Sequence, residues 1–310
     1  METTAPKKLI ADTTFERQSP TVEAMRRLLK HRSAQVGLVL LGILIICAIF
    51  APWIAPYDPI KPIRTATRRS PPCIHWLGCP ADQEQHLLGV DGNSRDLFSR
   101  IIYGSRVSLS IGIKIIGMAI IVGGLLGALA GFLGGGLDNG IMRSMDVLMA
   151  FPGILLAIAI VAVLGPGLDN ALIAIAIIEI PIYARVLRAS VLEIKDRDFV
   201  TASRSMGAGN YQLLFTRVLP NAMTPLIVQG TLGIATAILS AAALGFLGLG
   251  NQPPTAEWGS MLSEERNSVF NAPFLVFIPG LAIMMTVLAF NLIGDGLRDA
   301  LDPRLRGGGA

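Results

Sequence analysis

The side chains that could do chemistry are few in this sequence, and their spacing matches no catalytic pattern. The histidines His31, His75 and His86 lie outside the long apolar stretches, and neither His-Glu-x-x-His nor Gly-x-Ser-x-Gly occurs. No lysine follows a glycine, so the chain lacks the Gly-x-x-x-x-Gly-Lys-[Ser/Thr] loop that binds nucleotide phosphates. We therefore expect no catalytic residue, no metal ligand set and no bound cofactor in this chain.

The cysteines indicate one candidate covalent link. Cys73 and Cys79 share a polar segment that is rich in proline and glycine, which favours tight turns, whereas Cys47 lies in an apolar stretch and is interpreted as packing. We predict a Cys73–Cys79 disulfide, because disulfides persist in the oxidising space outside the cytoplasm. Two free thiols, or a metal site with His75 and His86, are the alternatives.

The composition predicts a membrane protein. Apolar residues make up 52% of the 310 and charged residues 15%, whereas about a quarter of the residues in a soluble domain are charged. A membrane helix needs about 20 mostly apolar residues. Six stretches approach or exceed that length: Val36–Ile54, Val107–Phe132, Val147–Leu164, Ala171–Ala184, Ala222–Gly250 and Ala272–Gly294. We expect an all-α integral membrane protein with six transmembrane helices.

One acidic residue lies within these stretches. Glu179 falls in the fourth stretch, and a carboxylate inside a membrane is costly enough to be a candidate polar site. The alternative is that Glu179 reaches the interface or pairs with a neighbouring basic residue. Pro152 and Pro181 are expected to kink the third and fourth helices, since proline removes a backbone donor.

The distribution of basic residues predicts the orientation. With both termini cytoplasmic, the inner segments carry 17 Lys and Arg and the outer segments carry 8, as the positive-inside rule requires. The predicted organisation is a cytoplasmic tail over 1–33, an uncleaved anchor helix over 34–56 and an outer loop with the cysteines over 57–106. A core of five transmembrane helices follows over 107–295, with a cytoplasmic loop over 191–220, and a cytoplasmic tail over 296–310.

Small residues recur at helical spacing in two of the predicted helices. Gly123, Gly127, Gly131 and Gly135 recur every fourth residue, which places them on one helix face; Ala237, Ala241 and Gly245 repeat the pattern in the fifth stretch. Membrane helices associate through such small residues because they permit close backbone contact. These faces pack either within the chain or against a partner.

The loop before the fifth stretch is predicted to form a helix–turn–helix. Asp198 is expected to cap a first short helix, Gly207 and Gly209 to end it, Asn210 to cap a second, and Pro220 to stop that one. A stripe of Phe199, Ala202 or Ser203, and Met206 is expected on the first helix. Small residues at 201–203 and 205 suit a cleft on another protein; the alternative is a pair of helices that only connects two spans.

This loop resembles the signature loop of bacterial ABC importer permeases. That pattern is Glu-Ala-Ala, three residues, Gly, and then Leu-Pro. Thr201-Ala202-Ser203 stands at the first three positions, so the usual Glu is absent, while Gly207 follows Met206 at the Gly position and Leu219-Pro220 at the last. The segments 86–100, 103–109, 242–259 and 290–303 resemble the dipeptide, oligopeptide and nickel importers more closely, whereas the insert 64–85 departs from their common pattern.

The resemblance implies a type I ABC importer permease in the inner membrane. It implies a homologous second permease, two cytoplasmic ATPase subunits that bind ATP and Mg, and an extracytoplasmic substrate-binding protein, with no nucleic-acid partner. Residues Thr201, Ala202, Ser203, Met206, Gly207, Leu219 and Pro220 would couple the permease to the ATPases. Dipeptides or oligopeptides are the expected substrates, with nickel, haem or glutathione as alternatives. An ion-gradient-driven secondary transporter is disfavoured because no repeat relates the two halves, and a membrane enzyme because catalytic motifs are absent.

Overall fold

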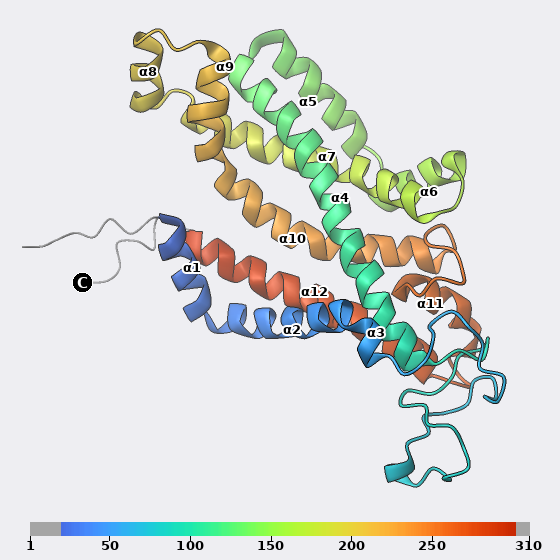
Figure 1. Cartoon of the computed structure of the whole chain (residues 1–310). Coiled ribbons are helices and arrows are strands. Elements are labelled where there is room, and N and C mark those ends of the chain that lie inside the picture. The colour runs from blue at the N-terminus through green and yellow to red at the C-terminus, as the bar shows by residue number, and fades with distance from the viewer. Residues whose placement is uncertain (1–19, 302–310) are drawn as a thin grey trace, which may run out of the picture.

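The computed structural model describes residues 20–301, and the regular elements in that range are helical apart from two isolated bridges. Residues 1–19 and 302–310 of the two predicted tails lie outside the described residues. Figure 1 shows the arrangement of the helices. They are α1 (Pro20–Lys30), α2 (Arg32–Ile49), α3 (Ala51–Ile54), α4 (Leu97–Leu133), α5 (Gly135–Met149), α6 (Gly153–Leu164), α7 (Leu168–Ile194), α8 (Asp198–Ser205), α9 (Asn210–Gln212), α10 (Leu219–Phe246), α11 (Trp258–Glu265) and α12 (Phe274–Leu301).

Among the described residues, five helices are long and apolar enough to cross a membrane: α2, α4, α7, the continuous helix Asn210–Phe246 that includes α10, and α12. The predicted third span, Val147–Leu164, is not one helix. It divides into α5 and α6, which meet at an angle of 91°, and together they supply a sixth span only if the bent pair is counted as one. Pro152 stands at the N-cap of α6, where its missing N–H costs no helical hydrogen bond.

Several helices extend beyond their apolar stretches. Helix α4 begins at Leu97 rather than near Val107, because the Asp96 side chain accepts a hydrogen bond from the backbone N–H of Ser99 and caps it. Helix α7 continues to Ile194 with Pro181 inside it, and α12 continues to Leu301. Hydropathy reports the membrane-crossing part of a helix, so it understates helices that continue into polar surroundings.

The glycines of α4 form a close contact with α7 within the chain. A Cβ added at Gly123 would lie 2.5 Å from the carbonyl oxygen of Ile180, and one at Gly131 would lie 2.9 Å from that of Arg188. Gly127, between them, also meets the α7 backbone. The two helices therefore pack backbone to backbone, as small residues in membrane helices permit.

The other members of the two small-residue patterns differ in what they contact. Gly135 is not part of the contact with α7, because it begins α5 with a positive φ and a Cβ added there would meet nothing within 4 Å. Ala237 and Ala241 are buried in the largest apolar cluster, and Gly245 meets the first turn of α11. These faces also pack inside the chain.

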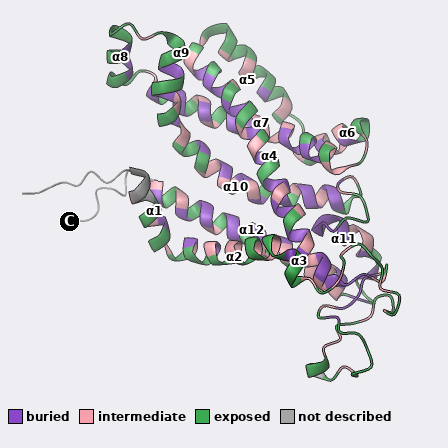
Figure 2. Cartoon of the chain, viewed as in Figure 1, coloured by how far each residue is buried: buried purple, intermediate pink, exposed green. Residues whose placement is uncertain are grey.

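Helix α2 lies along α12 and leaves one side apolar and uncovered. A Cβ at Gly37 would lie 2.8 Å from the carbonyl oxygen of Ala289, so the two helices are in close contact. On its other side, α2 exposes Val39, Ile43 and Ile46, and Figure 2 shows this exposed side. A helix this apolar and this exposed is suited to lipid rather than to water.

The two ends of the helical bundle carry different structures. Figure 1 shows α8 and α9 at one end, on the same side as α1 and the end of α12, and the coil of residues 55–96 at the other. Helix α11 lies at this second end, between α10 and α12. The predicted site loop and the predicted cysteine loop are therefore at opposite ends of the molecule.

Candidate functional site

The turn between α8 and α9 has a defined backbone geometry at Gly207. The backbone N–H of Gly207 donates to the carbonyl of Arg204 (3.0 Å), and that of Ala208 donates to the carbonyl of Ser203 (3.1 Å). Gly207 has φ +91°, a left-handed conformation that favours glycine. These bonds form a Schellman motif, so the predicted helix end at Gly207 is confirmed.

The helix starts in this loop lie one residue from their predicted places. Arg197 is the N-cap of α8 and makes no side-chain cap, so Asp198 is the first helical residue rather than the cap. Gly209 likewise precedes α9, and Asn210 is its first residue. Asp198 still lies in the first turn of α8, where a negative charge interacts favourably with the helix dipole.

The prediction that Pro220 stops the second helix is wrong. The helix continues from α9 through a π-helical segment, Leu213–Val218, into α10, where Pro220 occupies the first turn. The N–H of Leu219 reaches back to the carbonyl of Leu214, one residue further than in an α-helix. The wider turn accommodates the proline ring, which clashes with the i−4 carbonyl in regular α-helical geometry.

The buried face of α8 differs from the predicted stripe. Val200 and Ser203 face the body of the protein, while Phe199 and Met206 are exposed. Ala202 is exposed as well, whereas Ser203 is buried, so the stripe consists of Phe199, Ala202 and Met206. The predicted apolar stripe points outward because Val200 supplies the contact with the core instead.

The exposed residues of this loop, here named the α8–α9 surface, include several large apolar side chains. Met206 is 79% exposed and Tyr211 is 77% exposed, and the rings of Tyr211 and Phe215 pack with centroids 4.7 Å apart. The surface consists of Phe199, Thr201, Ala202, Met206, Tyr211 and Phe215. Gly207 and Pro220 are also exposed and Leu219 is partly exposed, so the signature positions other than Ser203 are accessible.

The loop is anchored to the helical body on its other side. Val200, Leu213, Leu214 and Val218 belong to the same buried cluster as residues of α4 and α7. The Lys195 ammonium group, just before α8, donates to the carbonyl of Gly131 at the end of α4 (3.0 Å). A displacement of the α8–α9 surface would therefore be transmitted directly to the long helices.

Glu179 lies on α7 at intermediate burial, and no ion pair or hydrogen bond to it is formed within the described residues. Tyr183, one turn further on, is fully buried, and its hydroxyl lies against Gly233 of α10 without a hydrogen-bond partner in that same part of the chain. Since α7 is one of the apolar helices, Glu179 stays a candidate intramembrane polar site.

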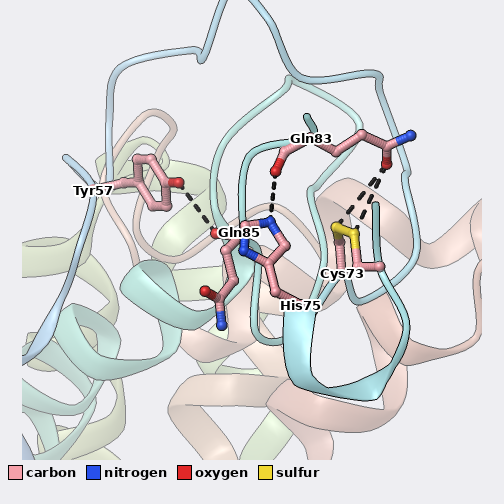
Figure 3. Close-up of a disulfide and its surroundings, with 6 residues drawn as sticks. Tyr57, Cys73, His75, Gln83 and Gln85 are labelled. Carbon is pink, nitrogen blue, oxygen red and sulfur yellow. Dashed lines mark hydrogen bonds between the residues drawn. A yellow bond between two sulfur atoms is a disulfide. The ribbon is translucent and has the colours of Figure 1, made fainter. Parts of the chain in front are cut away.

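At the opposite end of the molecule, Cys73 and Cys79 are paired in a disulfide, with Cα atoms 5.3 Å apart (Figure 3). Close to it, a ring nitrogen of His75 lies 2.8 Å from the carbonyl oxygen of Gln83, and the Tyr57 hydroxyl donates to the carbonyl of Gln85 (3.1 Å). These bonds hold the insert as a closed loop. His75 and His86 do not gather with other ligands, because the described residues contain no cluster suited to a metal.

Sequence reasoning missed a buried network of ion pairs behind this loop. Arg95 donates to Asp91 (2.7 Å) and to Glu264 (2.7 Å), and Arg100 donates to the same Glu264 (3.0 Å). The side chains of Arg95 and Arg100 are 4% and 1% exposed. The network connects the coil, the start of α4 and α11. The spacing of Asp91 and Arg95 was the only signal, because Glu264 is far away in the sequence.

Glu257 caps the start of α11, the helix that this network attaches to α4. Its carboxylate accepts hydrogen bonds from the backbone N–H groups of Gly259 (2.8 Å) and Ser260 (2.7 Å) and so caps the helix. Burial raises the pKa of the Glu257 carboxyl, and these hydrogen bonds act in the opposite direction. The cap fixes α11 against α10, where Gly259 and Ala242 pack closely.

Comparison with known proteins gives consistent results. Residues 123–307 match the family described as binding-protein-dependent transport system inner membrane component, and residues 19–72 match the N-terminal TM domain of oligopeptide transport permease C. The chain is 51% identical over 288 residues to the di/tripeptide transport system permease protein DppC of Pseudomonas aeruginosa, covering 93% of each chain.

Two further relatives and one solved structure extend the comparison. Identity is 47% to the dipeptide transport system permease protein DppC of Haemophilus influenzae, over 94% of this chain and 98% of that one. It is 46% to the glutathione transport system permease protein GsiD of Escherichia coli, over 94% and 92%. An inward-facing structure of the MetNI methionine ABC transporter is similar with a TM-score of 0.54 at 20% identity, covering 66% of this chain and 97% of that one. That similarity concerns the fold.

Proposed function

The chain belongs to the family of binding-protein-dependent transport system inner membrane components, and we propose that it forms the translocation path for dipeptides and oligopeptides together with a homologous second permease. It is an ABC importer permease. The observation that carries the peptide substrate is the 51% identity to a di/tripeptide permease along 93% of the chain. The resemblance found in the sequence agrees with this substrate, and the similarity to the MetNI transporter agrees with the permease fold.

The α8–α9 surface is the proposed contact with the ATPase subunits. It exposes large apolar groups, including Met206 and Tyr211, at one end of the helical bundle. Its opposite side is anchored in the core through Val200 and Leu214, so force applied to the surface reaches α7 and α10. Thr201 replaces the usual Glu of the signature loop, and the apolar groups around it supply the contact.

The orientation follows from this contact. ATPase subunits are cytoplasmic, so the end with α8 and α9 is proposed to face the cytoplasm and the disulfide end to face outward. The described ends of the chain, α1 and the end of α12, lie on the cytoplasmic side in this orientation, which agrees with the excess of Lys and Arg in the inner segments. The membrane is then the inner, cytoplasmic membrane.

The division of labour among the subunits leaves this chain non-catalytic. ATP and Mg are bound by two ATPase subunits, and an extracytoplasmic binding protein delivers the peptide. Reconstitution tests this: ATP hydrolysis and peptide uptake in proteoliposomes should require the chain, its permease partner and both ATPases together. ATP hydrolysis by the purified chain alone, or uptake driven by an ion gradient without ATPase subunits, would refute the proposal.

Glutathione is the second candidate substrate, because the chain is 46% identical to the glutathione permease GsiD. Uptake of a radiolabelled dipeptide by the complete importer distinguishes the two. We expect unlabelled dipeptides to compete and glutathione to leave uptake unchanged. Competition by glutathione, with transport of labelled glutathione, would assign the second substrate instead.

A further inference from the structure

A basic hollow lies at the disulfide end of the molecule, between the coil that follows α3 and the connection from α10 to α11. It measures about 670 Å³, and its walls include Ile63, Arg64, Arg68, Asn93, Pro253 and Glu264. These residues come from three segments that are distant in sequence. The hollow is separate from the α8–α9 surface, which lies at the opposite end of the bundle.

The charges around this hollow do not balance. Arg95 and Glu264, which line the hollow, belong to the buried ion pairs of Arg95 and Arg100 with Asp91 and Glu264, in which two positive and two negative charges balance. Two further lining residues, Arg64 and Arg68, are exposed and are here named the rim arginines. Neither rim arginine has a carboxylate partner within the described residues 20–301.

The neighbouring basic residues show that this lack of partners is local. On the same segment, Lys61 pairs with Asp58 (3.3 Å) and Arg69 pairs with Glu265 (3.2 Å). Arg64 and Arg68 are therefore the members of this basic segment left without a partner, and both line the same hollow.

The backbone that carries the two rim arginines is held in place. The N–H of Ile63 donates to the carbonyl of Ser94 (2.6 Å), and the N–H of Arg69 donates to that of Asp91 (3.1 Å). These bonds lie on either side of the rim arginines and attach their segment to the buried ion-pair network. A preorganised backbone lowers the entropy lost when the side chains bind a partner.

We infer that this hollow is a docking site for carboxylate side chains of the extracytoplasmic binding protein. The inference rests on the proposed function, which places this end of the chain outside the membrane. A guanidinium group binds a carboxylate with two parallel hydrogen bonds, and two such groups on one rim match a pair of acidic side chains. Opposite charges on the two surfaces would also accelerate their encounter.

The test measures binding of the binding protein encoded beside the permease gene to the complete importer in nanodiscs of zwitterionic lipid. The variant Arg64→Glu/Arg68→Glu reverses both rim charges, and Arg64→Gln/Arg68→Gln removes them. Lys61→Glu is the matched control, because Lys61 belongs to the same segment, is 81% exposed and does not line the hollow. Since both rim arginines are exposed and unpaired, these variants should fold, which gel filtration of the complex verifies.

We expect the Kd of the reversed variant to rise about tenfold, that of the neutral variant to rise less, and that of the control to stay within about twofold. The Kd of the wild type should rise with salt, and that of the neutral variant should rise less steeply. Equal affinity and equal salt dependence in all variants would overturn the docking site but not the proposed function. Failure of the wild type to bind would overturn the function itself. The measurement is repeated in nanodiscs of anionic lipid, and an effect of the variants seen only there would assign the hollow to a lipid headgroup instead.

Discussion

Gly207 and Gly209 stand close together in the turn between α8 and α9, yet their backbones predict opposite outcomes for the same substitution. Gly207 has φ +91°, in the region that L residues rarely adopt, whereas Gly209 has φ −70° and is the N-cap of α9. No atom lies within 4 Å of an added Cβ at either position. Any difference between Gly207→Ser and Gly209→Ser therefore comes from backbone conformation and not from a steric clash.

The expected magnitude follows from this difference. A non-glycine residue in the left-handed region costs about 1–2 kcal/mol, which changes the ratio of two competing conformations about five- to thirtyfold. Serine at Gly209 is favourable instead, because serine is a preferred N-cap residue. Since the turn sets the shape of the α8–α9 surface, we expect Gly207→Ser to lower ATP-driven peptide uptake about five- to thirtyfold and Gly209→Ser to leave it unchanged.

The assay is uptake of a labelled dipeptide by the complete importer in proteoliposomes, with ATP hydrolysis measured in the same samples. Gel filtration checks that each variant assembles. Gly207→Asn adds a graded test, because asparagine tolerates the left-handed region better than serine and should retain more uptake. Wild-type uptake in Gly207→Ser would refute the reasoning, as would an equal loss in Gly209→Ser.

Three further predictions address packing, charge and orientation. Gly127→Leu should lower the thermal stability of the chain, because the leucine side chain would meet the α7 backbone and overpacking costs about 1–3 kcal/mol or more. Gly117→Leu should not lower it, because nothing lies within 4 Å of an added Cβ there. Equal melting temperatures of the two variants would refute the contact. Glu264→Gln should lower the free energy of unfolding by about 3–5 kcal/mol, because it leaves two buried arginines short of a carboxylate. Glu193→Gln removes an exposed ion pair and should change it little in the same thermal denaturation experiment. A cysteine at Ser205 should react with a membrane-impermeant thiol reagent only from the cytoplasmic side, and labelling from outside would reverse the proposed orientation.

The membrane helices and the glycine contact could be predicted because each depends on a local pattern. Uncharged stretches identify α2, α10 and α12, and the fourfold spacing of Gly123, Gly127 and Gly131 identifies one helix face. The end of α8 at Gly207 also follows from the sequence, since few residues other than glycine adopt its conformation. In each case the responsible residues lie within a few turns of one another.

The features that the sequence did not reveal depend on direction or on distant partners. Pro152 predicted a kink in the span Val147–Leu164, but mean hydropathy is blind to direction and did not reveal two separate helices, α5 and α6, at an angle of 91°. The prediction that Pro220 stops a helix was wrong, because a π-helical segment before it accommodates the proline ring. The buried pairing of Arg95 and Arg100 with Glu264 joins segments more than 150 residues apart, and no local pattern reports such a contact.

The proposed coupling and docking sites lie at opposite ends of the helical bundle, and α10 runs between these ends. The helix that begins at α9 continues without a break into α10. Helix α10 ends beside α11, where Glu264 lines the basic hollow. At that end, the buried ion pair of Arg100 with Glu264 attaches α11 to the start of α4. The glycines of α4 in turn pack against α7, which leads into the loop with α8 and α9. Contacts among α10, α11, α4 and α7 therefore connect the two surfaces. Because Pro220 and the π-helical segment interrupt regular hydrogen bonding in the helix that leads into α10, we expect bending during transport to concentrate there.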